Sequence, residues 1–203
     1  MKFQFKLLNF FGQPVEISIW FLALFFILSS KTVIVLFLSV LIHEMSHVYT
    51  SEKLGYKTFG IKLDVLFGLA KIQSDITPKD NIKIVVAGPL SNLALFLIGL
   101  LLYDITPYSE FFSTLSMINL LMFFVNILPI FPLDGGRIVR DVLFLITDSK
   151  RSIRISAMSS LIFSVISLLF SVVNSLLVCA LFALLFIYHS LIDLNIIKTD
   201  GDY

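Results

Sequence analysis

The sequence is poor in charged residues and in cysteine. Only 14% of its 203 residues are charged, whereas 58% are hydrophobic, including 21 phenylalanines, and the mean hydropathy is +0.97. This composition excludes a soluble domain with a large core and predicts a polytopic membrane protein. The single cysteine, Cys179, lies in an apolar run, so neither a disulfide framework nor a thiolate metal site is expected.

The sequence also lacks the features of a nucleic-acid-binding protein. Its net charge is +1, and it has no basic cluster with interleaved aromatic residues. It contains no internal repeat and no low-complexity tail, so we expect a single transmembrane domain over residues 1–203. No small-residue cleavage pattern follows the first apolar run, which is therefore expected to be a retained span rather than a signal peptide.

Six apolar stretches are long enough to cross a bilayer, which requires about 20 helical residues. They lie at residues 14–30, 32–52, 82–103, 111–130, 155–174 and 176–196. Very short turns join the first two and the last two, so each of these pairs should form an antiparallel hairpin. The sequence thus predicts an all-α polytopic fold with six transmembrane helices. A fold with four or five spans would need one of these hairpins to be re-entrant.

The distribution of basic residues predicts the orientation in the cell membrane. If the N-terminus is cytoplasmic, every Lys and Arg except Lys31 falls in a cytoplasmic segment. The positive-inside rule therefore predicts that both termini are cytoplasmic. The polar residues near the end of the second span then lie on the cytoplasmic side of the bilayer midplane.

The segment between the second and third spans is too polar to cross the membrane. In residues 59–65, apolar side chains alternate with Gly60, Lys62 and Asp64, and Gly68 interrupts the pattern before residues 70–73. Period-two alternation around a glycine predicts a small β-hairpin at the cytoplasmic interface. An interfacial loop without a functional role is the alternative on pattern alone.

The second span carries three residues whose spacing suits a metal site. On a helix, residues four apart share a face, so His43 and His47 could bind one metal ion. Glu44 projects about 100° round from His43, where it could reach a water at that metal. The pattern can arise by chance, but burying two imidazoles and a carboxylate at membrane depth is costly and usually marks function.

A catalytic zinc site typically needs a third protein ligand beside the water. His189, near the end of the last span, suits a helix end or the interface better than a metal site. Asp134 is the better candidate, because two prolines break the helix before it and two glycines allow a sharp turn after it. Non-helical backbone at membrane depth is tolerated only beside protein or a water-filled cavity. The alternative is that Asp134 caps the helix that follows.

Two motifs in the sequence resemble the paired motifs of the site-2 proteases, which are intramembrane zinc metalloproteases. They are HExxH at residues 43–47 and NxxPxxxLDG at residues 126–135, and the run AGPLSN at residues 87–92 is also typical of that family. The resemblance covers nearly the whole chain and is strongest to the branch containing the sporulation peptidase that processes pro-sigma-K. That branch usually carries a nucleotide-sensing CBS domain. No such domain is found in this sequence, so regulation through one is not expected.

The resemblance implies roles for several residues of these motifs and for Gly68. His43, His47 and Asp134 would bind one Zn²⁺ per chain, and Glu44 would be the catalytic base. A second group would bind the substrate or stabilise the oxyanion: Asn126, Pro129 and Gly68. A third group would have structural roles beside the site: Gly88, Pro89, Asn92 and Gly135.

The implied function is hydrolysis of a peptide bond within or near the transmembrane segment of a membrane-protein substrate, in the lipid bilayer. The substrate would add to the strands of residues 59–72 as an extra strand. An inhibitory or activating membrane partner and a homo-oligomer are both compatible with the sequence.

Other functions at the same centre would have different sequence signatures. A metal-binding membrane protein without peptidase activity is the main alternative. A transporter should show more intramembrane acids and histidines than this chain has, and an inactive relative should lack Glu44 or Asp134. A membrane protease acting near a lipidated C-terminus is a further alternative, which the match at residues 133–135 disfavours.

Overall fold

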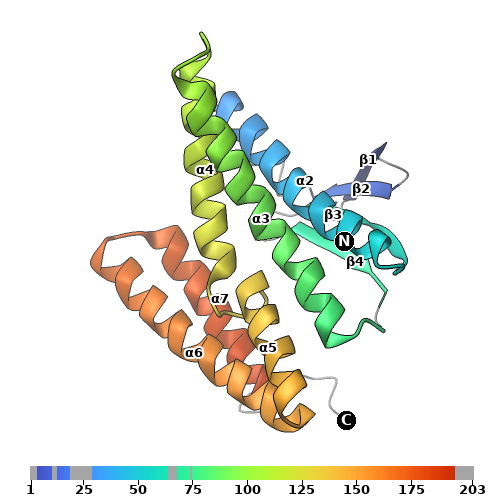
Figure 1. Ribbon diagram of the computed structural model, residues 1–203. Coiled ribbons are helices and arrows are strands. Elements are labelled where there is room, and N and C mark those ends of the chain that lie inside the picture. Colours follow the sequence, from blue (N-terminus) through green and yellow to red (C-terminus); the bar gives the residue numbers. More distant parts are fainter. Residues whose placement is uncertain (1–3, 11–12, 19–28, 64–67, 74, 195–203) are drawn as a thin grey trace. The chain divides into compact units, whose positions relative to one another are not determined.

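The computed structural model describes residues 4–10, 13–18, 29–63, 68–73 and 75–194. The chain divides into two compact units, Met1–Phe124 and Val125–Tyr203, whose elements are labelled in Figure 1.

The first unit contains a four-stranded sheet in the order β1-β2-β3-β4. Strands β1 (Gln4–Phe10) and β2 (Gln13–Ser18) form an antiparallel pair, as do β3 (Thr58–Leu63) and β4 (Gly68–Ile72). Strands β2 and β3 are parallel, with Val15 opposite Ile61. Parallel neighbours need a crossover connection, and helix α2 (Ser30–Lys53) lies within it.

Strand β2 corrects the start of the first predicted span, which was expected to be helical over 14–30. Its residues through Ser18 are extended and pair with both β1 and β3. Val15 and Ile17 alternate with Glu16 and Ser18, a period that suits a strand and not a helix. Residues 19–28 of that predicted span lie outside the described residues.

The part of the chain that the structure describes is mostly helical, as the apolar runs predict. Four described helices are long and apolar enough to cross a membrane: α2, α3 (Pro78–Tyr103), α4 (Ser109–Ile127) and α6 (Ser149–Val173). Helix α7 (Leu177–Asp193) is apolar but shorter, and α5 (Asp134–Ile146) begins at the predicted acid.

Local hydrogen bonds fix where the helices of the first unit begin. The side chain of Ser29 accepts from the N–H of Thr32 at α2, and the side chain of Thr77 accepts from the N–H of Asp80 at α3. Helix α2 then packs against α3 and against both β3 and β4 (Figure 1). The C-terminal half of α2, which carries the two histidines, therefore lies beside the first turns of α3.

In the second unit, α6 packs against both α5 and α7. The packed face of α6 presents small buried side chains one or two turns apart: Ser152, Ser156, Ser160, Ser164 and Ser171. Ser160 accepts hydrogen bonds from Oγ of Ser190 on α7 at 2.8 Å and from the N–H of Phe131 at 3.1 Å. Helix α6 thus holds the non-helical segment that precedes α5.

Candidate metal centre

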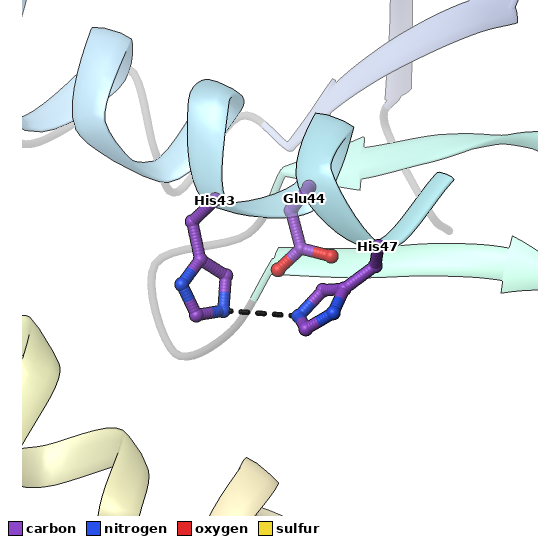
Figure 2. A group of neighbouring side chains, drawn as sticks. All are labelled: His43, Glu44 and His47. Atoms are coloured by element: carbon purple, nitrogen blue, oxygen red, sulfur yellow. Dashed lines mark hydrogen bonds between the residues drawn. The ribbon is translucent and has the colours of Figure 1, made fainter. Parts of the chain in front are cut away.

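The two histidines of α2 leave the same helix face, one turn apart. Figure 2 shows the rings of His43 and His47 directed toward one another, with the Glu44 carboxylate beside them. Their ring centroids are 4.8 Å apart, and the two ring planes are nearly perpendicular. The two Nε2 atoms are 3.2 Å apart. All three side chains are buried, with exposed fractions of 4%, 5% and 3% for His43, Glu44 and His47. The spacing in the sequence has produced the predicted juxtaposition.

Oxygen acceptors fix the tautomer of each ring. Nδ1 of His43 lies 2.6 Å from Oδ1 of Asn92, and Nδ1 of His47 lies 2.8 Å from the backbone carbonyl oxygen of Ile84. Both oxygens accept and cannot donate, so each Nδ1 carries the ring proton. Each neutral ring therefore keeps a lone pair on Nε2, and the two lone pairs face one another.

This arrangement fits a metal ion. Two lone pairs at 3.2 Å repel, and a cation held by both nitrogens removes that repulsion. Two nitrogens at the usual zinc distance of about 2.0–2.1 Å lie about 3.3 Å apart in a tetrahedral site, close to the observed separation. Ligand atoms of His43, Glu44 and His47 all lie within 4.8 Å of one another, so this group could hold a metal ion. Nδ1–H donation to an oxygen is the usual way in which metal-binding histidines are oriented.

Helix α3 provides the room for the two rings. A Cβ at Gly88 would lie 2.5 Å from Nε2 of His47 and 2.6 Å from Cε1 of His43. Any side chain at this position would therefore displace both rings. Pro89 lies inside α3. Asn92, the last residue of the same motif, is fully buried and forms a hydrogen bond with His43. The AGPLSN run thus contributes space and orientation to the histidines.

The second unit carries the predicted third ligand at the first position of α5. Asp134 is buried, and its Oδ1 lies 3.8 Å from Nη1 of Arg137. The two residues after it pack directly on the preceding backbone. A Cβ at Gly135 would overlap the carbonyl oxygens of Ile127 and Leu128, and one at Gly136 would overlap the backbone of residues 130–131. Only glycine permits this close turn.

The remaining predicted residues lie on several elements. Asn126 is partly buried near the end of α4, and Pro129 is partly buried in the segment before α5. Gly68 is the first residue of β4 and pairs with Leu63. His189 is exposed on α7 beside Tyr188.

Two buried residues near the histidines were not predicted from the sequence. Asn119 on α4 accepts a hydrogen bond from Nδ2 of Asn92 at 2.9 Å, and it donates to Oγ of Ser39 on α2 at 2.8 Å. A polar side chain inside an apolar span was the available signal, because such residues are costly at membrane depth.

Comparison with known proteins agrees with this geometry. The model of peptidase family M50 matches residues 103–170. A zinc metalloprotease of Methanocaldococcus jannaschii is 32% identical over 162 residues, which cover 70% of this chain and 46% of that protein. The stage IV sporulation protein FB of Bacillus subtilis is 28% identical over 60% of this chain and 44% of its own length. This chain thus spans less than half the length of these two curated relatives.

In two further comparisons, the match covers most of the relative's own length. The putative zinc metalloprotease YwhC of Bacillus subtilis is 30% identical over 148 residues, or 54% of this chain and 68% of that protein. The solved structure of a site-2 protease from Methanocaldococcus jannaschii superposes with a TM-score of 0.71 at 26% identity, covering 99% of this chain and 100% of that one. With the HExxH helix and the paired rings described above, these matches show that this chain belongs to the site-2 protease family of zinc metallopeptidases, peptidase family M50.

Proposed function

We propose that this chain is an intramembrane zinc metalloprotease that hydrolyses a peptide bond within or near the transmembrane segment of a membrane-protein substrate. The observation that supports the proposal best is the pair of Nε2 atoms of His43 and His47, which lie 3.2 Å apart, buried beside Glu44 on a helix apolar enough to span a bilayer. Such a group at membrane depth is expensive to bury and suits a functional centre.

His43, His47 and Asp134 are the proposed zinc ligands. Two imidazole nitrogens and one carboxylate oxygen form a donor set typical of catalytic zinc sites, which keep their fourth position for water or substrate. Bound zinc supplies Lewis acidity that polarises a carbonyl group and lowers the pKa of water to about 7. The turn that the two glycines after Asp134 allow would hold this carboxylate at the start of α5.

Glu44 is the proposed general base. Its carboxylate oxygen would accept a proton from water as the water oxygen attacks the substrate carbonyl carbon, and would return the proton to the leaving amide nitrogen. Its burial next to both histidines keeps it close to the metal-binding nitrogens. A positioned base of this kind contributes about 10²- to 10⁴-fold to the rate.

The sheet and the segment before α5 are the proposed substrate-binding elements. Among the described strands, β4 stands at the end of the sheet order, so an extended substrate could pair with it and expose its peptide bond. Asn126 and Pro129, with Gly68 at the start of β4, are the proposed contacts. Ile61→Pro interrupts the β3–β4 ladder, so cleavage of a membrane-embedded substrate should fall while bound zinc persists. Unchanged cleavage would exclude this role for the sheet.

The proposed topology is a single membrane-embedded domain with six spans and the sheet at the cytoplasmic interface. The four long apolar helices and the apolar α7 support five of these spans. The sixth rests on the apolar run of residues 19–28, which follows β2 in the sequence. Both termini and the metal centre are placed on the cytoplasmic side, because all basic residues except Lys31 then lie inside. The proposed partner is a transmembrane substrate. A membrane regulator or a second copy of the chain is compatible with the proposal.

The decisive experiment pairs zinc content with cleavage. Wild type, Glu44→Gln and Asp134→Asn are purified in detergent, bound zinc per chain is measured, and each is incubated with tagged transmembrane substrates. We expect Glu44→Gln to keep zinc but lose cleavage by at least about 100-fold, and Asp134→Asn to bind zinc more weakly. Glu110→Gln, at an exposed ion pair with Lys31, is the matched control and should behave as wild type.

Two results would count against the proposal. Wild-type protein that binds no zinc under non-chelating conditions would refute the metal site. Zinc bound without Glu44-dependent cleavage of any substrate would favour a metal-binding membrane protein that is not a protease.

A further inference from the structure

A chain of buried polar side chains connects His43 to the backbone of α4. Asn92 of α3, Asn119 of α4 and Ser39 of α2 are all fully buried. Oδ1 of Asn92 lies 2.6 Å from Nδ1 of His43, and Nδ2 of Asn92 donates to Oδ1 of Asn119 at 2.9 Å. Nδ2 of Asn119 donates to Oγ of Ser39 at 2.8 Å and to the carbonyl oxygen of Leu115 at 2.9 Å. Three helices of the first unit thus meet in one network.

The carbonyl of Leu115 sets the direction of every donor in this network. A backbone carbonyl oxygen only accepts, so Asn119 must face it with Nδ2. Oδ1 of Asn119 is then the atom that faces Asn92, which must present its own Nδ2 in return. The Asn92 Nδ2 also lies 3.8 Å from Sδ of Met122, so all four amide hydrogens of the two asparagines have partners. Oδ1 of Asn92 is left to face His43.

This direction decides which nitrogen of His43 carries the proton. An amide oxygen at 2.6 Å requires a hydrogen on Nδ1, which leaves the lone pair of Nε2 directed at His47. If the Asn92 amide turned by 180°, its NH₂ group would donate to Nδ1, and the ring proton would move to Nε2. A protonated Nε2 cannot bind a metal ion.

We propose that Asn119, supported by Ser39, is a positioning residue of the metal centre: it locks the Asn92 amide and through it the metal-binding tautomer of His43. His47 needs no such chain, because the carbonyl of Ile84 fixes its tautomer directly. The inference rests on the proposed role of His43 as a zinc ligand, but it concerns the ring in the metal-free protein as well.

Burial explains why this orientation of the two amides is strongly favoured. Each polar atom of the network lies inside helices that are apolar enough to span a membrane, where water cannot replace a lost partner. Turning one amide would leave a donor facing a donor at one end and an acceptor facing an acceptor at the other. In a medium of low dielectric constant both mismatches are costly, so the network has a single favourable direction.

The tautomers can be read directly by NMR of metal-free protein labelled with ¹⁵N in histidine. The chain contains only three histidines, and His189→Gln removes the one on α7. We expect both remaining rings to carry their proton on Nδ1. A wild-type His43 protonated on Nε2 would overturn the proposal. This measurement uses neither zinc nor substrate, so its failure is distinct from the failure of the protease assignment.

Asn119→Leu removes the amide while keeping a side chain of similar size. We expect the spectrum of His43 to gain the Nε2–H form and zinc affinity to fall by about tenfold or more, as for other lost partners of metal-binding histidines. The tautomer of His47 should not change, because the carbonyl of Ile84 still accepts from its Nδ1–H, and this tautomer is therefore an internal control. The Nε2 signal of His47 should shift, because this atom then accepts from the new Nε2–H of His43. Ser116→Ala removes another buried polar group of α4, one that donates to the carbonyl of Phe96 at 3.1 Å, and should leave zinc affinity and both tautomers unchanged.

A rescue variant separates orientation from packing. In the Asn119→Leu background, Asn92→Asp places a carboxylate next to His43, and a carboxylate accepts whichever way it is turned. Nδ1 should regain its proton, and zinc affinity should recover. A packing defect would not be repaired in this way, so a folded double variant without recovery would contradict the proposal.

Ser39→Ala, a milder change, should shift the tautomer of His43 in the same direction as Asn119→Leu. Wild-type tautomers and zinc affinity in both Ser39→Ala and Asn119→Leu would also overturn it.

Discussion

Gly88→Ala is predicted to destroy the metal centre by displacing both of its rings. The added Cβ would lie 2.5 Å from Nε2 of His47 and 2.6 Å from Cε1 of His43, whereas ordinary contacts begin at 3.4 Å. The rings or α3 must therefore move by about 0.9 Å. Zinc sites tolerate ligand shifts of about 0.2 Å, so this displacement is several times too large. We expect zinc affinity to fall by about 100-fold or more, which corresponds to about 2.7 kcal/mol.

Gly99→Ala is the matched control for this prediction. It makes the same substitution in the same helix, with the same gain in helix propensity of about 1 kcal/mol. Its Cβ would crowd Ser116 and lie 2.9 Å from the carbonyl oxygen of Phe112, and Gly99 lies about 16 Å along α3 from Gly88. Competition titrations with a zinc chelator and thermal unfolding should be run on both variants. Only Gly88→Ala should lose zinc affinity, and a folded Gly88→Ala protein with wild-type affinity would refute the reasoning.

Three further predictions concern the second unit and the metal. Arg140→Lys should lower the free energy of unfolding by about 1–3 kcal/mol, because lysine cannot stack on the Phe131 ring at 3.8 Å and keep the partly buried ion pair. Arg151→Lys, in a largely exposed pair, should change it by less than about 0.5 kcal/mol, and equal shifts in Tm would contradict this difference. Gly135→Ala should distort the turn before α5 and weaken zinc binding in titrations, and unaltered binding would argue against Asp134 as a ligand. Chelation should abolish cleavage of a transmembrane substrate, and added Zn²⁺ should restore it. Cleavage that persists in metal-free protein would exclude a metalloprotease.

The part of the centre that lies on one helix could be predicted from the sequence. The spacing of His43 and His47 determines that they share a face, and helix geometry alone brings their rings together. The residues that orient the rings could not be predicted in the same way. Asn119 is 27 residues from Asn92 and 80 from Ser39, so their contacts depend on how three helices pack. Asp134 as the third ligand stays a prediction.

The sheet shows a second limit of reading the sequence. Hydropathy predicted one span over residues 14–30, because a single window averages the hydropathy of strand β2 with that of the apolar residues after it. The alternation from Val15 to Ser18 indicated the strand, but its partner β3 follows a long crossover and cannot be identified from local pattern. Length and apolarity were sufficient for the long helices, where the bilayer requirement acts on each helix by itself.

The parallel pairing of β2 with β3 has a consequence for the order in which the protein assembles. Val15 lies opposite Ile61, and the whole of α2 separates these two residues along the chain. Closing so long a loop costs entropy that a few strand hydrogen bonds repay poorly while the intervening chain is disordered. Once α2 is formed, with β3 and β4 packed against it, the same closure joins elements that are already constrained. We therefore expect the complete sheet to appear only after the histidine-bearing helix is in place, so that the strands at the N-terminus of the chain are among the last elements to join the fold.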